Sequence, residues 1–451
     1  MELKKYKLAD IADFNKSSIS KSETFKEIIY LDTSSITENV VSGTVIMNTK
    51  EAPSRAQRKV TNNTIIYSTV RPRLKHYGIL SLPQNNFIVS TGFTTIDIKD
   101  LYKDKIDPRY LYLLLTQPTI TDYIGNIADT AVSAYPSINP SDLSSLCFMF
   151  PDHAIQKTIA DIWNNYDRKI ELNRAINQNL EAMAKQLYDY WFVQFDFPNE
   201  EGKPYKSSGG AMVWNEELKR EIPQGWSNMS IGDYAPCKSG YAFKSKDFGD
   251  KGLSVIKIGN IQENYTLDMT DSQCIDLFNK TLFLAKRYDL VIAMTGATIG
   301  KFAISQSNYW VNQRVGRFDL GDRPLLRLGF LFNSLKQEYF REQVFQIACG
   351  CAQPNISAEQ IDSISILKPN DVILNQFNKL CEPLLELQSE NYLQIEELTK
   401  QRDELLPLLM SGQVSVNSDL SVCIDLIIRT TTRICSYPND LFWSYLRIVF
   451  L

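Results

Sequence analysis

Two segments of the sequence combine positive charge with a complete lack of acidic residues. Residues 52–96 contain no Asp or Glu, and neither do residues 290–318. Lys and Arg neutralise phosphates, while Arg, Asn, Gln, Ser and Thr can hydrogen-bond to base edges. Basic, acid-free segments with such polar neighbours favour contact with a polyanion such as DNA. An ordinary solvated basic surface is the alternative interpretation.

The candidate DNA-contacting residues are basic and polar side chains of these two segments. In the first segment they are Arg55, Arg58, Ser68, Arg71, Arg73, Lys75 and Thr91. In the second they are Thr298, Lys301, Asn312, Gln313 and Arg314.

Catalytic and metal-binding motifs are missing from the sequence. His76 and His153 are the only imidazoles, and the eight Cys include no CxxC pair. GATIGK (296–301) is one residue too short for a phosphate loop, and Phe302 stands where Ser or Thr would bind magnesium. No tetrapeptide for amino-methyl transfer is present, that is, no NPP or DPP followed by Phe, Tyr or Trp. We therefore predict no catalytic residue and no metal site.

Length and charge set further limits. A chain of 451 residues is too long for one core, so we expect several domains. Its net charge of −4 argues against a simple basic nucleic-acid binder. Scattered cysteines without a signal peptide predict a cytoplasmic protein, and no apolar run is long enough to cross a membrane.

Two long helical stretches separate the blocks that carry these residues. The first, 155–191, has apolar positions in seven-residue steps and no Pro or Gly. The second, 372–410, has the same pattern and an expected interruption at Pro383. The predicted order is a mixed α/β domain (1–150), a helix (151–197), a turn-rich linker (198–225), a second mixed domain (226–369), a second helix (370–413) and a tail (414–451).

The two predicted helices carry matching seams that could pair as an antiparallel coiled coil. The residues expected to form the pairing surface are Ile162, Asn173, Leu180, Leu187, Leu380, Asn391, Leu398 and Leu405. Asn173 and Asn391 occupy equivalent places, and a polar residue in a seam can fix the register of the pair. The alternative is that these Asn side chains face solvent.

An internal repeat joins the two halves. PSINPSDL (136–143) recurs as PNISAEQI (354–361), and the same shift of 218 residues lays the first helix over the second. More loosely, 65–79 lies over 290–304 and 87–93 lies over 309–315. The predicted fold is α+β: two tandem mixed α/β recognition domains separated by two long helices, with an approximate twofold relation.

Several stretches of this repeat resemble the specificity subunits of type I restriction–modification systems. They are KIELNRAINQNLEAMAKQLYDYWFVQFDF (169–197), IPQGW (222–226), YSTVRPRL, VSTGF, TGATIGK, VNQRVGR and LLPLLMSGQV. The resemblance covers about residues 1–413. It implies a non-catalytic subunit with two target-recognition domains, each reading half of a split DNA site. The helices would act as a spacer and as the docking surface for two modification (methyltransferase) subunits.

The resemblance also implies partners and cofactors. Restriction subunits would join the complex, and S-adenosylmethionine, ATP and Mg²⁺ would be bound by the partners. Two other functions stay open at this point: a stand-alone nuclease or DNA methyltransferase with an unrecognised site, and a coiled-coil adaptor that does not touch DNA. Family members usually end near LLPLLMSGQV, so residues 415–451 are expected to be an atypical, recombined or frameshifted end.

Overall fold

The computed structural model describes residues 3–20, 25–130, 135–276, 279–348 and 354–411. The atypical tail predicted for 415–451 lies outside these ranges. The chain forms two compact units, of which the first is 1–169 with 400–451 and the second is 170–399. The unit boundaries fall inside the two long helices, whereas the predicted domain boundaries fall where these helices begin.

The first unit contains two four-stranded sheets. One has the order β2-β11-β8-β9 and the other β6-β3-β10-β7, in which β3 and β10 are parallel. The strands are β2 (Ala12–Phe14), β3 (Glu27–Leu31), β6 (Val45–Asn48), β7 (Ala56–Lys59), β8 (Ile65–Ser68), β9 (Tyr77–Ile79), β10 (Phe87–Ser90) and β11 (Phe93–Ile98). A further pair joins β1 (Lys4–Lys7) to β12 (Cys147–Phe150), and a short one joins β4 (Ile36–Thr37) to β5 (Val40–Val41).

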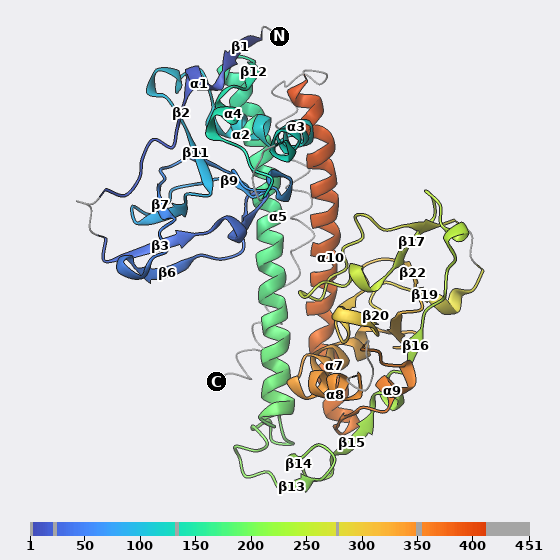
Figure 1. Ribbon diagram of the computed structural model, residues 1–451. Coiled ribbons are helices and arrows are strands. Elements are labelled where there is room, and N and C mark those ends of the chain that lie inside the picture. The colour runs from blue at the N-terminus through green and yellow to red at the C-terminus, as the bar shows by residue number, and fades with distance from the viewer. Residues whose placement is uncertain (1–2, 21–24, 131–134, 277–278, 349–353, 412–451) are drawn as a thin grey trace. The chain divides into compact units, whose positions relative to one another are not determined.

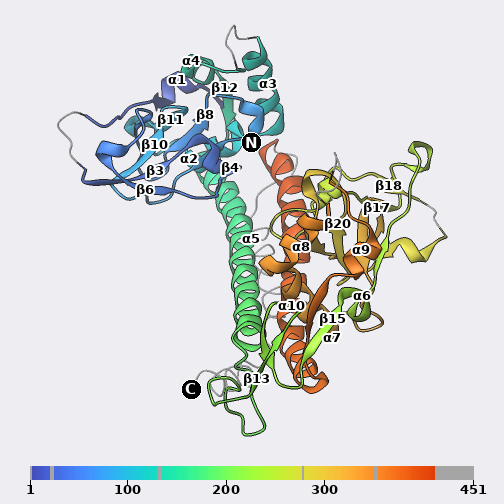
Figure 2. The ribbon, with the colours of Figure 1, turned by 60° about the horizontal axis from the view of Figure 1, so that its bottom comes forward.

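Short helices complete this first globule. They are α1 (Leu8–Ile11), α2 (Pro108–Leu115), α3 (Pro118–Asp129) and α4 (Pro140–Ser144). Proline opens α2, where its fixed φ suits the first helical turn and its missing N–H costs nothing, and the Asp107 carboxylate accepts the backbone N–H of Arg109. In both ribbon views α3 and α4 lie at one end of the first globule and β3 and β6 at the other (Figures 1 and 2).

The second unit repeats the topology of both four-stranded sheets. Its sheets have the orders β16-β23-β20-β21 and β18-β17-β22-β19, again with one parallel pair, β17 with β22. The strands are β16 (Cys237–Ser239), β17 (Leu253–Ile256), β18 (Cys274–Ile275), β19 (Leu284–Ala285), β20 (Leu290–Ala293), β21 (Phe302–Ile304), β22 (Tyr309–Val311) and β23 (Val315–Phe318). The pair β15 (Ser227–Ser230) with β24 (Ser365–Lys368) matches β1 with β12. The duplication predicted from the sequence is therefore confirmed at the level of topology.

The helices of the second globule follow the same order. They are α6 (Ile231–Tyr234), α7 (Leu325–Leu335), α8 (Glu338–Ala348) and α9 (Ala358–Asp362). The segment predicted as a linker contains a hairpin, β13 (Met212–Asn215) with β14 (Arg220–Pro223). Ile222 of this hairpin is fully buried, and the ring of Phe197 stacks on Trp226 with centroids 4.7 Å apart. Residues 198–225 are thus an ordered part of the second unit.

Two long helices, α5 (His153–Tyr188) and α10 (Asp371–Met410), contribute to both units. A π-helical turn, Asp189–Val193, follows α5 and buries Trp191 and Phe192. The ring of Phe192 packs edge-on against Phe377 of α10, with centroids 4.8 Å apart, within the second unit. There the second half of α5 and the first half of α10 lie side by side (Figure 1).

The interruption expected at Pro383 does not occur, because α10 continues through it. Pro383 and Lys379, the residue whose carbonyl loses its helical N–H donor, are both exposed. Water can satisfy a carbonyl on this face, so the helix tolerates the proline there. Within the second unit the helices run antiparallel, since Asn173 meets Gln394 and Asn177, one turn later in α5, meets Asn391, which comes earlier in α10. In the first unit Asp167 of α5 pairs with Arg402 of α10.

Candidate nucleic-acid interface

Three backbone hydrogen bonds hold three connections of the first globule together. The N–H of Thr69 donates to the carbonyl of Gly92 (2.9 Å), that of Ile138 to Thr69 (2.9 Å) and that of Arg71 to Pro136 (2.8 Å). These bonds join the β8–β9 connection, the β10–β11 turn and the segment before α4. We call residues 69–76, 91–92 and 135–138 the first loop cluster.

The second globule makes the same three bonds. The N–H of Met294 donates to the carbonyl of Arg314, that of Ile356 to Met294 and that of Gly296 to Pro354, each at 3.0 Å. Residues 294–301, 312–314 and 354–356 form the second loop cluster. Both acid-free segments identified in the sequence therefore contribute to equivalent loops, which present different side chains on one framework.

Three of the predicted residues of the first globule lie on its exposed surface next to one another. Thr91 is exposed in the β10–β11 turn, and its N–H donates to the carbonyl of Arg55 (2.8 Å). Arg55 is exposed and pairs with Asp32 at 2.7 Å. Arg71 is exposed, and its guanidinium lies over the ring of Tyr135, 4.9 Å from the ring centroid. Tyr135 was not singled out in the sequence, although it directly precedes the PSINPSDL repeat.

Arg71 and Lys75 both have left-handed backbone conformations, with φ of 48° and 56°. Non-glycine residues seldom adopt such values, and where they do the surrounding structure holds them there. The side chain of Lys75 pairs with Glu38 at 2.6 Å and remains about half exposed. Exposed ion pairs of this kind are weak, so Lys75 remains available to a phosphate.

The three other predicted residues of the first globule make contacts within it: Ser68 and Arg58 in its buried and half-buried parts, and Arg73 on its exposed surface. Ser68 is buried and its hydroxyl donates to the carbonyl of Val70 (2.9 Å). Arg58 lies half-buried in β7, and removal from water lowers the pKa of its guanidinium. Arg73 donates to Asp122, Asn126 and Asp129 of α3. A base edge or phosphate would have to compete with these contacts, so we rank these three predictions below the other candidates.

The second loop cluster exposes two predicted residues in one tight turn. Gln313 and Arg314 occupy the turn between β22 and β23, the position that Thr91 and Gly92 occupy in the first globule. The half-buried Asn312 shapes this turn, since its Oδ1 accepts the N–H of Arg314 (3.3 Å). Lys301 is one-third exposed and pairs with Glu263 at 3.1 Å. Thr298 is half-buried and its hydroxyl points inward.

The predicted pairing residues of the helices lie in the interior of their units. In the first unit Ile162 is buried and lines a narrow cleft together with the half-buried Leu405. In the second unit Leu180, Leu398, Asn173 and Asn391 are buried. Leu187 and Leu380 are half-buried and pack against the main core of the second globule.

The two seam asparagines do not face solvent. Asn173 donates to the side-chain carbonyl of Gln394 (3.2 Å), and Asn391 donates to that of Asn177 (2.9 Å). Each seam asparagine thus pairs with a polar residue of the opposite helix and not with the other seam asparagine.

Across the part of the chain that the structure describes, no three His, Cys, Asp or Glu side chains gather in a way that could hold a metal ion. Among the same residues, no helix combines the length and apolarity needed to span a membrane.

The sequence also matches known proteins along nearly its whole length. The family model for the type I restriction modification DNA specificity domain matches residues 1–182 and 223–397, so it covers both repeats. The HindI specificity subunit of Haemophilus influenzae is 25% identical, over 91% of this chain and 99% of that protein. The MjaIX specificity subunit of Methanocaldococcus jannaschii is 24% identical, over 80% of this chain and 83% of that protein.

A solved structure shares the fold. The crystal structure of a type I restriction-modification S subunit from M. genitalium covers 91% of this chain and 96% of its own, with a TM-score of 0.57 and 16% identity. The resemblance seen in the sequence motifs is therefore confirmed, and with it the non-catalytic recognition role. The duplicated loop clusters, the paired helices and these matches show that the chain belongs to the type I restriction-modification DNA specificity family, and that its function is DNA target recognition.

Proposed function

We propose that the two loop clusters read the two halves of a split, asymmetric DNA target. The observation that carries this proposal is the identical three-bond framework with different exposed side chains. The first cluster presents Arg71 and Thr91, and the second presents Gln313 and Arg314. A common framework places each cluster against DNA in the same manner, while different side chains select different bases.

The exposed side chains suit direct reading of base edges. An Arg can bind guanine with two hydrogen bonds and a Gln can bind adenine likewise, each worth about 1–3 kcal/mol of discrimination. Arg71 is held over the ring of Tyr135, which limits the conformations that its guanidinium has to give up on binding. Arg55 and Lys75 remain accessible at the rim and would contact phosphates.

The helices would set the spacing between half-sites and carry the partners. Apolar side chains on the exposed side of α5, Leu172 and Ile176, lie one turn apart and are 52% and 40% exposed. Neighbouring exposed apolar residues on a helix suit a docked protein. We propose that two modification subunits bind this scaffold and that restriction subunits join them. S-adenosylmethionine, ATP and Mg²⁺ would be bound by those partners, and the complex would act on DNA in the cytoplasm.

Methylation mapping tests this proposal. The chain is co-expressed with its modification partners, and methylated sites are located by sequencing. We expect one bipartite motif with a fixed gap, and a continuous motif or no methylation would contradict the proposal. Arg314→Gln should relax one base position in a single half of the motif, while Arg71→Gln should alter only the other half.

Binding measurements separate this role from that of an adaptor without DNA contact. Arg71→Glu together with Arg314→Glu should abolish binding of the mapped duplex by the assembled complex. The control reverses Lys5 of β1 and Arg323, which are exposed and lie outside the loop clusters. If both double variants bind the mapped duplex equally well, the proposal is wrong.

A further inference from the structure

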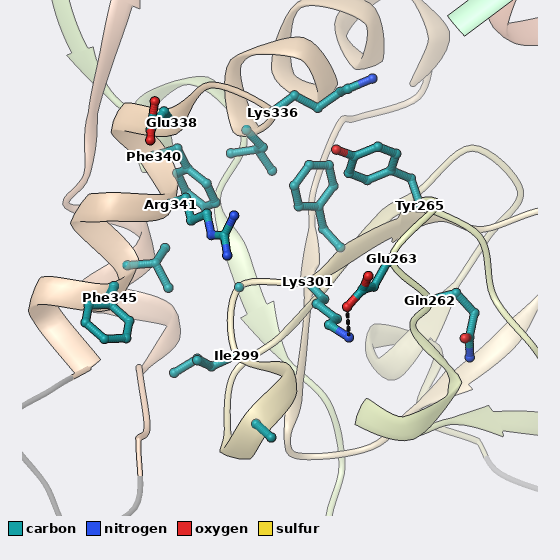
Figure 3. Close-up of a pocket in the computed structure, with 15 residues that line it drawn as sticks. Gln262, Glu263, Tyr265, Ile299, Lys301, Lys336, Glu338, Phe340, Arg341 and Phe345 are labelled. Carbon is teal, nitrogen blue, oxygen red and sulfur yellow. Dashed lines mark ion pairs between the residues drawn. The ribbon is translucent and has the colours of Figure 1, made fainter. Parts of the chain in front are cut away.

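The second globule has a cavity of about 660 Å³ beside its loop cluster. Three elements line it: the loop 296–302, the turn 262–265 and helix α8 with the end of α7 (Figure 3). Its size is within the range of pockets that hold small ligands, and all of its walls belong to the second unit.

Two cations face this cavity from opposite walls. Arg341 of α8 is exposed, and among the described residues its guanidinium has no recorded ion pair. Lys301 lies across from it and pairs with Glu263, which is 86% exposed, so solvent weakens that pair. The carboxylate of Glu338 points away from Lys301 in Figure 3. Lys336 is nearly buried and pairs with Glu181, so it serves the structure.

The same cavity has an apolar side. Phe340 and Val344 are buried in its wall, and Ile299 is half-buried beside them. Phe345 is 64% exposed at the lower edge, close to Ile299 (Figure 3). Two cations on opposite walls, with an exposed aromatic ring one helical turn from Arg341 on α8, match the two parts of a nucleotide, its phosphate and its base.

The equivalent space in the first globule is filled. There Arg73 extends from the β8–β9 connection onto α3 and donates to Asp122, Asn126 and Asp129. Gly125 leaves room for it, because a Cβ at that position would lie 2.8 Å from the Arg73 guanidinium carbon. In the second globule Thr298 stands in the place of Arg73. Because α8 begins at Glu338 as α3 begins at Pro118, Glu342 and Gln346 stand where α3 has Asp122 and Asn126, and Phe345 stands where α3 has Gly125.

We propose that the cavity holds one nucleotide of the target DNA, with its phosphate between Arg341 and Lys301 and its sugar and base against Ile299 and Phe345. This site rests on the proposed DNA-reading function and exists in the second globule alone, because Arg73 closes the first. The second half-site would therefore be bound at one more point than the first.

The test measures affinity for the mapped duplex against salt concentration, using the assembled complex. Each phosphate contact contributes about 0.9 to the slope of log K against log salt. Arg341→Gln and Lys301→Gln should each lower the slope, and the two changes together should lower it by about one, because both cations contact the same phosphate. Phe345→Ala should leave the slope unchanged and weaken binding about fivefold or more, because a base loses its aromatic contact.

Two further variants define the controls. Arg323→Gln removes an exposed Arg of the same globule outside the cavity and should change neither slope nor affinity. Arg73→Gln should leave the slope unchanged, since Arg73 is engaged with α3. The proposal is overturned if Arg341→Gln behaves like Arg323→Gln, if Phe345→Ala binds normally, or if Arg73→Gln lowers the slope.

Arg314→Gln, measured in the same series, distinguishes this proposal from the function on which it rests. If Arg314→Gln weakens binding and Arg341→Gln does not, the loop cluster reads DNA and the cavity proposal fails alone. If neither change has an effect, the proposed reading of DNA by the second globule fails as well.

Discussion

The side-chain amide of Asn391 donates a 2.9 Å hydrogen bond to the side-chain carbonyl of Asn177, and the two residues are 1% and 3% exposed. Asn177 in turn donates to the backbone carbonyl of Gln388 (3.2 Å). The pair joins α5 to α10 inside the second unit. Buried amides that satisfy each other only in one alignment can fix the register of paired helices.

Replacing one member of this pair should destabilise the second unit. Asn177→Leu leaves the Asn391 amide buried without its acceptor, which costs about 1–3 kcal/mol. Asn177→Leu combined with Asn391→Leu should cost less than the sum of the single changes. Urea unfolding followed by tryptophan fluorescence measures this, because the second unit contains Trp191, Trp214, Trp226 and Trp310. Additive effects would show that the two amides are not coupled.

Gly240 lies so close to neighbouring backbone atoms that any side chain at this position would clash with them. A Cβ at this position would lie 2.2 Å from the carbonyl oxygen of Val311 and 2.3 Å from that of Asn312. These atoms lead into the turn that carries Gln313 and Arg314. We expect Gly240→Ala to destabilise the second unit by about 3 kcal/mol, the upper end for ordinary substitutions, and to weaken DNA binding.

Gly259→Ala is the matched control for this change. Gly259 lies in the same unit, and a Cβ there would have no neighbour within 4 Å. Its unfolding midpoint should stay close to that of the unaltered chain. A similar loss of stability in both variants would mean that loss of glycine, and not the close approach to the Val311 carbonyl, causes the effect.

The repeat was readable in the sequence because strands and turns kept their spacing. Ile65–Ile79 and Leu290–Ile304, aligned by motif, form the same two strands and the same connection. The charge of a residue predicted its role less well than its place in the repeat did. Arg73 and its acceptors Asp122 and Asp129 lie about 50 residues apart, so the sequence did not show that this cation is already paired.

The helical seam was only partly predicted, for a geometric reason. A seven-residue repeat predicts a buried residue at 176, but Ile176 is 40% exposed and Asn177 is buried. The buried positions Tyr166, Asn177 and Tyr188 are spaced by eleven residues. An α-helix has 3.6 residues per turn, so a strict heptad line drifts off the buried face unless the helices supercoil. Because the buried face shifts in this way, Asn173 pairs with Gln394 and Asn391 pairs with Asn177, and the two seam asparagines do not pair with each other.

Cysteine reactivity should report on the packing of α7 against α10. Cys381 is fully buried, and a Cβ at Gly329 of α7 would lie 2.6 Å from its own Cβ. Burial raises the pKa of the Cys381 and Cys237 thiols, so little reactive thiolate forms at pH 8. With N-ethylmaleimide and peptide mass spectrometry, the exposed Cys147 should be labelled first among the four cysteines that the structure describes. Labelling of Cys381 at the rate of Cys147 in the folded chain would contradict the close packing.

The stability of the first globule should depend on pH through Asp97 of β11. Its carboxylate accepts the hydroxyl of the buried Thr64 at 2.5 Å. Burial raises the pKa of Asp97, and the Thr64 hydrogen bond offsets this only in part. Because the folded pKa exceeds the unfolded one, the stabilising contribution is full below the ordinary Asp pKa and is lost as pH rises through the folded value.

Asp97→Asn tests this dependence, since the amide keeps an oxygen acceptor for Thr64 and never ionises. The variant should gain stability relative to the unaltered chain as pH rises above about 4, and the gain should level off once the pH has passed the folded pKa of Asp97. Thermal unfolding midpoints of both proteins from pH 4 to pH 7.5 give the comparison, with Asp104→Asn at an exposed carboxylate as the control. A difference between the Asp97→Asn and unaltered chains that does not change with pH would show that Asp97 ionises equally readily in the folded and unfolded chains.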